Sequence, residues 1–181
     1  MRIALVPGAL ALSPRYASIE DPVAELRAAV ETALDWVGPQ PRLLGDAHGV
    51  IGELLERSGS SSDGQTADGV VVVANGSATR SEKAPGHFDE RALAFDDWLR
   101  EALTVDPGEL NHLDTSLAEE LWADVEAIPE LATLLGGPGP ADFAPAETDP
   151  GPQRPRVRLI GVDYDDDPYG VKYWVIRWEV A

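Results

Sequence analysis

The chain has 181 residues, with 32 acidic and 14 basic side chains and a formal net charge of −18. This charge repels phosphate backbones and anionic membrane surfaces, so we expect no nucleic-acid partner and no membrane partner. The absence of Cys excludes disulfides, thiolate metal sites and Cys nucleophiles, and no apolar stretch is long enough to predict a membrane span. The acidity is uneven, because residues 101–153 contain 12 acidic side chains and no Lys or Arg.

The N-terminal segment carries one Arg and an apolar run, residues 2–6, that ends at Pro7. We favour a buried first strand over a signal peptide, because no clear small-residue cleavage site follows the run. We therefore expect a cytoplasmic protein. A helix is predicted over residues 21–37, with Asp21 as its N-cap and Gly38 at its end.

The next predicted elements are a short strand over residues 42–44 and a helix over residues 50–57. Residues 70–74 are four valines and an alanine, a run typical of a strand that is buried on both faces. Residues 58–69, which precede this strand, are rich in Ser and Gly and predict a flexible loop.

Two further helices are predicted in the following segment. Asp89 is expected to cap the first helix, and Ser116 to cap the second, which Pro129 breaks or kinks. The residues expected inside the first of these helices are Leu93, Phe95, Trp98, Leu99 and Leu103.

The C-terminal part begins with residues 136–155, a Gly/Pro-rich stretch that predicts a second flexible loop. Residues 156–163 and 171–180 then predict two strands joined by a turn, and so an antiparallel hairpin. Alternating strands and helices followed by a hairpin predict a single α/β domain over residues 1–181. We expect three layers, with a mostly parallel central sheet and an antiparallel C-terminal hairpin.

The segment after the 70–74 strand is the best candidate for a ligand site, because ligands of open α/β sheets bind beyond the carboxyl ends of the strands. A solvated loop whose polar side chains cap backbone groups is the alternative interpretation. The chain has no Walker loop, no Gly-x-Ser-x-Gly elbow and no dinucleotide fingerprint. The ligand-binding candidates are Asn75, Ser77, Thr79, Arg80, Glu82, Lys83, His87 and Tyr169.

The three histidines, His48, His87 and His112, lie at no helical or hairpin spacing. Surface positions explain them more simply than a metal site, although a fold can assemble ligands from distant residues. Asp163 and the acidic run at residues 165–167 lack the spacing of a calcium loop, so we expect their charges to face water.

Two motifs stand out, residues 76–86 (GSATRSEKAPG) and residues 164–171 (YDDDPYGV). Residues 71–110 also contain the helix pattern Phe95-Asp96-Asp97-Trp98-Leu99. Together these segments resemble the class III extradiol ring-cleavage dioxygenases of the LigB type. The likeness is closer to a bacterial branch of short LigB-like proteins, in which sequences similar to both motifs are found.

The resemblance implies a mixed α/β fold and a non-haem Fe(II) held by two His and one Glu, with a further His as acid and base. Here the segment after the first strand, residues 6–10 (VPGAL), contains no His, and Arg80 aligns with the catalytic His. Arg cannot act as a base near neutral pH. His48 and Glu126 are weak candidates for the other two ligands. A site that lacks one His holds Fe(II) poorly, so we expect the iron site to be lost.

We therefore expect a LigB-like domain without ring-cleavage activity, whose remnant cleft binds a small anionic ligand through Arg80. No cofactor is predicted, and non-haem Fe(II) is expected only where an altered form of the family site retains it. Two alternatives stay open. One is a metal-dependent ring-cleavage dioxygenase or hydrolase with a rearranged site of His and carboxylates. The other is a subunit or interaction protein, for example a homo-oligomer paired through Trp174 and Trp178.

Overall fold

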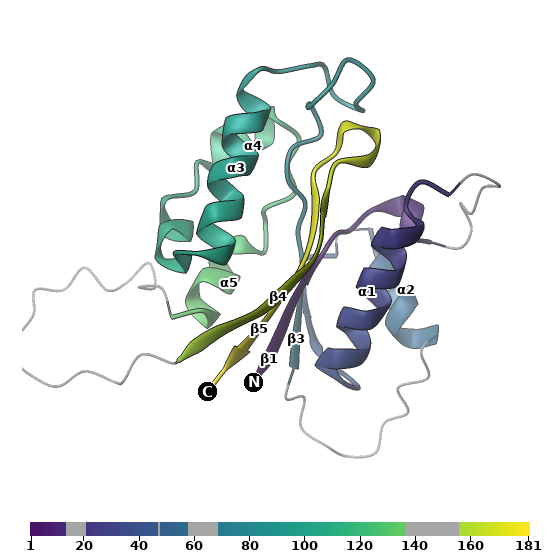
Figure 1. The fold of residues 1–181 in the computed structure, drawn as a ribbon, viewed down its shortest axis with the longest axis vertical. Helices are drawn as coiled ribbons and strands as arrows, with labels where there is room; N and C mark the ends of the chain where they lie inside the picture. Colours follow the sequence, from purple (N-terminus) through teal and green to yellow (C-terminus); the bar gives the residue numbers. More distant parts are fainter. Residues whose placement is uncertain (14–20, 47, 58–68, 137–155) are drawn as a thin grey trace, which may run out of the picture.

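Five strands form one mixed sheet in the order β2-β3-β1-β5-β4 (Figure 1). Strands β1 (Arg2–Val6), β2 (Arg42–Leu44) and β3 (Gly69–Val73) are parallel, and β4 (Val157–Asp166) and β5 (Tyr173–Val180) form an antiparallel hairpin. Strand β1 joins the two parts, because it pairs in parallel with β3 and antiparallel with β5. The computed structural model describes residues 1–13, 21–46, 48–57, 69–136 and 156–181. The predicted α/β fold with its C-terminal hairpin is confirmed.

The sheet is the middle of three layers (Figure 1). Helices α1 (Ala24–Val37) and α2 (Val50–Arg57) cover one face, and their buried residues share a core with the inner residues of β1 and β3. Helices α3 (Arg91–Thr104), α4 (Thr115–Glu120) and α5 (Ile128–Leu134) cover the other face. Three short 3-10 helices complete the described elements: Leu10–Leu12, Pro107–His112 and Pro168–Gly170.

Strand β3 is buried along its whole length, as the run of valines predicts. Because successive side chains of a strand point to opposite faces, Val70 and Val72 enter the core under α3, whereas Val71 and Val73 enter the core under α1. Full burial of such a side chain stabilises the fold by about 1.5–3 kcal/mol. This strand therefore anchors both layers of helices and holds the start of the following loop in place.

Helix α1 begins at Ala24, later than predicted, and Asp21 is not its N-cap residue. The Asp21 carboxylate instead accepts a hydrogen bond from the Val23 N–H at 3.2 Å and pairs with Arg27, so it stabilises the first turn from outside the helix. Gly38 ends the helix as predicted, with a φ of 98° that favours glycine.

The α4 region differs from the prediction. Asp114, not Ser116, caps α4, because its side chain accepts a hydrogen bond from the Leu117 N–H at 2.9 Å. The helix then ends at a Schellman-type turn in which Trp122 has a φ of 58°, at the position where most helices place Gly. Pro129 does not kink this helix; it lies in the first turn of the separate helix α5, where its missing N–H costs nothing.

The expected inner face of α3 is correct for Phe95, Leu99 and Leu103, which are buried, and Trp98 is partly buried against the same core. Leu93 is an exception, because half of its surface is exposed. Asp89 lies before the helix and accepts a hydrogen bond from the Arg91 N–H at 2.9 Å.

Alternate side chains of β5 enter the two cores on opposite faces of the sheet. Trp174 and Trp178 are each only 1% exposed in the core under α3, and the Trp178 ring N–H donates to the Leu103 carbonyl at 3.2 Å. The proposed pairing of two copies through these Trp side chains is therefore wrong, because the chain's own helices cover them. A homo-oligomer that pairs through another surface stays a prediction.

The loops predicted at residues 58–69 and 136–155 lie almost wholly outside the described residues; Gly69 begins β3 and Gly136 follows α5. Among the described helices, none combines the length and the apolar character needed to cross a bilayer.

Candidate functional site

The first residues of the loop after β3 are hydrogen-bonded to Lys172, which directly precedes strand β5. The Gly76 N–H donates to the Lys172 carbonyl at 2.9 Å, and the Lys172 N–H donates to the Ser77 carbonyl at 2.9 Å. A Cβ atom at Gly76 would lie 2.6 Å from a carboxylate oxygen of Asp96 and 2.8 Å from the Trp174 ring. Only glycine allows this close approach, and the contacts therefore fix the start of the loop against α3 and the segment before β5.

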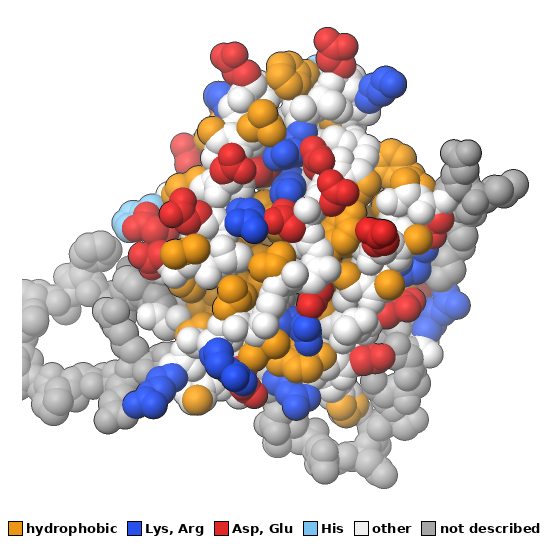
Figure 2. All heavy atoms as spheres, viewed as in Figure 1, with side chains coloured by type: hydrophobic (Ala, Val, Ile, Leu, Met, Phe, Trp, Pro, Cys, Tyr) orange, Lys and Arg blue, Asp and Glu red, His pale blue; other side chains and the backbone are white. Residues whose placement is uncertain are grey.

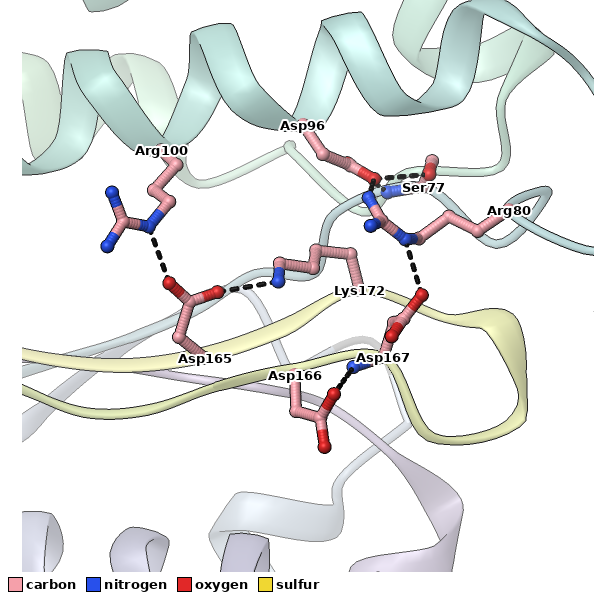
Figure 3. A network of polar contacts seen from close by, with 8 residues as sticks. All are labelled: Ser77, Arg80, Asp96, Arg100, Asp165, Asp166, Asp167 and Lys172. Carbon is pink, nitrogen blue, oxygen red and sulfur yellow. Dashed lines mark hydrogen bonds and ion pairs between the residues drawn. The ribbon is translucent and has the colours of Figure 1, made fainter.

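Asp96 of α3 is the buried centre of the site. Its carboxylate is 1% exposed and accepts three hydrogen bonds: from the Ser77 N–H at 2.8 Å, the Ser77 hydroxyl at 2.7 Å and Nη1 of Arg80 at 2.7 Å (Figure 3). A buried carboxylate needs such partners, because leaving it unpaired away from water is costly. Asp96 thus ties the loop to the helix that covers it.

Arg80 connects this centre to the hairpin. Its Nε donates to Asp167 at 2.7 Å, and its backbone N–H donates to the Gly170 carbonyl at 3.3 Å (Figure 3). Burial lowers the pKa of Arg80, but the hydrogen bonds to Asp96 and Asp167 raise it more, so the guanidinium stays charged. The side chain therefore links three segments: the loop, α3 and the tip of the β4–β5 hairpin.

A second ion-pair cluster lies beside the first. Asp165 of β4 contacts Nζ of Lys172 and Nε of Arg100, each at 2.5 Å (Figure 3). Burial raises the pKa of Asp165, but the hydrogen bonds from Lys172 and Arg100 together lower it by more, so the pKa lies below its usual value. The residues in Figure 3 include three bases and four acids, so the two clusters nearly neutralise themselves.

The acids at residues 165–167 do not all face water, contrary to expectation. Asp165 and Asp167 pair with bases of α3, of the segment before β5 and of the loop, and Asp166 accepts a hydrogen bond from the Asp167 N–H at 2.8 Å. Neither their roles nor that of Asp96 follows from local sequence spacing. The sequence feature that could have indicated this contact is the pair of motifs at residues 76–86 and 164–171. The structure brings these two motifs together through Arg80 and Asp167.

The predicted ligand-binding residues separate by exposure. Ser77 and Thr79 are buried, and Asn75 and Arg80 are partly buried. Asn75 belongs to a different contact, because its side-chain oxygen accepts the Gly8 N–H at 3.1 Å. The exposed members of the set are Glu82, Lys83, His87 and Tyr169.

A separate acidic group lies near the carboxyl ends of the parallel strands. The Asn75 N–H donates to the Asp124 carbonyl at 2.8 Å. Burial raises the pKa of the Asp124 side chain; a hydrogen bond from the Glu126 backbone lowers it in part, the Glu126 charge raises it, and nearby His48 lowers it. His48 and Glu126, the weak metal candidates, thus lie within electrostatic range of the same carboxylate.

This group does not fit the iron site that the resemblance implies. In the described part of the chain, no three His, Cys, Asp or Glu side chains are placed to hold one metal ion. In the segment that follows β1, the Gly8 N–H donates to the Asn75 side-chain oxygen, and residues 6–10 contain no His. His112 lies elsewhere, 3.6 Å from Glu109, and both side chains are largely exposed.

Comparison with known proteins gives no match to any family model and none to a curated sequence.

Proposed function

We propose that this chain is a LigB-like domain that does not cleave aromatic rings and that acts by binding a ligand. The observation that carries the proposal is the state of Arg80, which aligns with the catalytic His of that family. A guanidinium that donates to Asp96 and Asp167 cannot accept a proton from a substrate. The donor groups described above give no set of three metal ligands, which also supports a non-catalytic role.

A ring-cleavage assay tests this proposal. Purified protein is incubated with Fe(II) without oxygen, then mixed with catechol or protocatechuate in aerated buffer. We expect no oxygen uptake and no absorbance of a ring-opened product above that of Fe(II) alone. Turnover by the protein would contradict the proposal. Metal analysis of untagged protein separates the alternative, because iron, zinc or manganese at one equivalent favours an enzyme with a rearranged site of His and carboxylates.

The ligand we propose is a small anion that replaces Asp167 on Arg80. The two carboxylates that pair with Arg80 differ in exposure: the Asp96 side chain is 1% exposed, whereas that of Asp167 is 40% exposed. Asp96 therefore holds the guanidinium in place, and the outer carboxylate is the one that a ligand carboxylate or phosphate can displace. Arg offers a planar set of donors that suits such groups.

Calorimetry with inorganic phosphate and malonate tests the exchange. Asp167→Asn removes the competing charge, so we expect it to raise affinity by about tenfold, which corresponds to about 1.4 kcal/mol. Asp163→Asn is the matched control, because Asp163 is a hairpin carboxylate that pairs with Arg177 instead. An Asp167→Asn variant that binds neither anion better than the control would contradict this ligand class.

A further inference from the structure

A second candidate site lies on the outer side of α3, away from Arg80. A cavity of about 380 Å³ is lined by the apolar side chains of Ala94, Phe95, Trp98 and Leu117. This volume lies within the range of small-molecule sites, which are mostly apolar with a few polar groups. The α3 residues lie three and four positions apart, so they form one stripe along the helix.

Two basic side chains, Arg91 and His112, also line this cavity, and each lies beside carboxylates; His112 is 3.6 Å from Glu109. Arg91 contacts Asp89 at 2.6 Å and Glu120 at 2.8 Å, and these two carboxylates hold the pKa of Arg91 above its usual value. Asp114 also lines the cavity and caps α4. The charge near the cavity is therefore not positive overall, and an anionic ligand has no unopposed cation to bind there.

Trp98 lines both this cavity and a second, acidic one. The second cavity, of about 260 Å³, is lined by Trp98 and Ala102 and by three acids, Glu101, Asp106 and Glu109. Glu101 continues the same stripe of α3, one turn after Trp98. Its described lining residues include no base, although Glu109 lies 3.6 Å from His112, which lines the first cavity.

The wider charge pattern points the same way. Residues 101–153 contain no Lys or Arg, and Figure 2 shows acidic side chains gathered near a histidine at the outer edge of the α3 layer. A negative surface of this kind raises the local concentration of cations. The face of a Trp ring attracts a cation as well.

From these observations we infer that the two cavities form one site for a small organic cation with an apolar body. The apolar body lies against Phe95 and Trp98, and the ammonium group lies beyond the Trp98 ring near Glu101 and Glu109. This site is independent of Arg80 and takes a ligand of the opposite charge. The arrangement assigns the ligand class by charge complementarity across a single aromatic side chain.

Three probes with the same apolar body test the inference: phenylbutylamine, phenylbutanol and phenylbutyrate. Calorimetry at neutral pH and low salt is expected to rank the amine first, and the amine to bind at least about tenfold more tightly than the carboxylate. Added salt is expected to weaken the amine and leave the alcohol unchanged. Equal affinity of the amine and the carboxylate overturns the inference, as does failure of the amine to bind at millimolar concentration.

Variants then assign the binding to this site. The double variant Glu101→Gln and Glu109→Gln is expected to lower amine affinity by about tenfold without changing that of the alcohol. Ala94→Trp fills the apolar cavity and is expected to abolish binding of all three probes. Glu56→Gln on α2, on the opposite face of the sheet, is the control and should change nothing. Unchanged amine affinity in the double variant overturns the inference.

Other occupants give different results. A concentration-dependent dimer in solution scattering that Ala94→Trp disrupts would assign the groove to a second copy of the chain. Binding of a Lys-rich peptide without binding of the amine would assign it to a protein partner. Either result overturns the small-molecule site.

Discussion

Two charged regions flank α3, and they use charge in opposite ways. At the inner side, Asp96, Arg80 and Asp167 satisfy one another, and the residues form a partly buried tie between loop, helix and hairpin. At the outer side, Glu101, Asp106 and Glu109 line a cavity that has no basic lining residue among those described, and Glu109 lies 3.6 Å from His112 outside it. We infer that charged side chains paired within the fold, such as Arg80 and Asp96, contribute to stability. Charged side chains without a basic neighbour in the cavity lining, such as Glu101, are available to a ligand.

The largest expected effect is on the inner region. Arg80→Ala leaves the buried Asp96 carboxylate without its cation, so we expect the free energy of unfolding to fall by about 3 kcal/mol. Chemical denaturation followed by circular dichroism measures this. Arg100→Ala is the control, because the Arg100 side chain is 46% exposed and its loss should cost less than about 1 kcal/mol. Equal losses would contradict the distinction between the buried tie and a surface pair.

A backbone change tests the same region without removing a charge. In Gly76→Ala the new Cβ lies 2.6 Å from Asp96 and 2.7 Å from Cβ of Lys172, so we expect a loss of about 1–3 kcal/mol from steric displacement. In Gly161→Ala the nearest contact outside its chain neighbours is 3.8 Å, and the stability should change little. Thermal unfolding of the two variants provides the comparison.

The pH dependence of stability separates two carboxylates with opposite pKa shifts. The lowered pKa of Asp165 means that its stabilisation is present above about pH 3.8, its unfolded value, and is lost as pH falls through the lower folded value. The raised pKa of Asp124 has the reverse sign, because its ionisation opposes folding as pH rises above 3.8. At pH 7 we therefore expect Asp165→Asn to destabilise the protein and Asp124→Asn to stabilise it.

Denaturation midpoints measured between pH 3 and pH 7 check these signs. Both differences from the unsubstituted chain should shrink towards the acid end of the range, because the fraction of each carboxyl group that is ionised falls with pH. A difference for Asp165→Asn that grows as pH falls would contradict the assignment.

The smallest expected effect belongs to the outer region. Glu101→Gln should change the free energy of unfolding by less than about 0.5 kcal/mol, because surface substitutions that break no buried contact rarely do more. The same variant is expected to weaken the binding of phenylbutylamine. A clear loss of stability would mean that Glu101 is part of the fold's own ion pairing, and the contrast between the two regions would fail.

Much of the fold was predictable from local patterns. The valine run of β3, the Gly38 end of α1 and the inner face of α3 each have a local physical cause, and each appears largely as expected. The α4 region was mispredicted because its end depends on a left-handed Trp122, which propensity assigns to helix interiors or strands rather than to a helix end. Local rules fail where a tertiary contact holds an uncommon backbone conformation.

The sequence was sufficient to propose where in the chain the candidate site lies, but not which residues contact one another within it. The loop after the buried strand was identified from the position of ligand sites in α/β sheets, and Arg80 was singled out within it. The partners of Arg80 come from α3 and from the hairpin tip, 16 and 87 residues away in sequence. No spacing rule connects such positions.

By itself, the sequence determined most of the strands and helices, because hydrophobic periodicity and turn residues act over a few neighbouring positions. It also determined the strongly negative net charge and the absence of Cys. Only the tertiary structure decided which charges neutralise one another and which remain at a cavity. Electrostatic pairing depends on distance and burial in the folded chain, and the sheet sets both when it brings β4, β5 and α3 together.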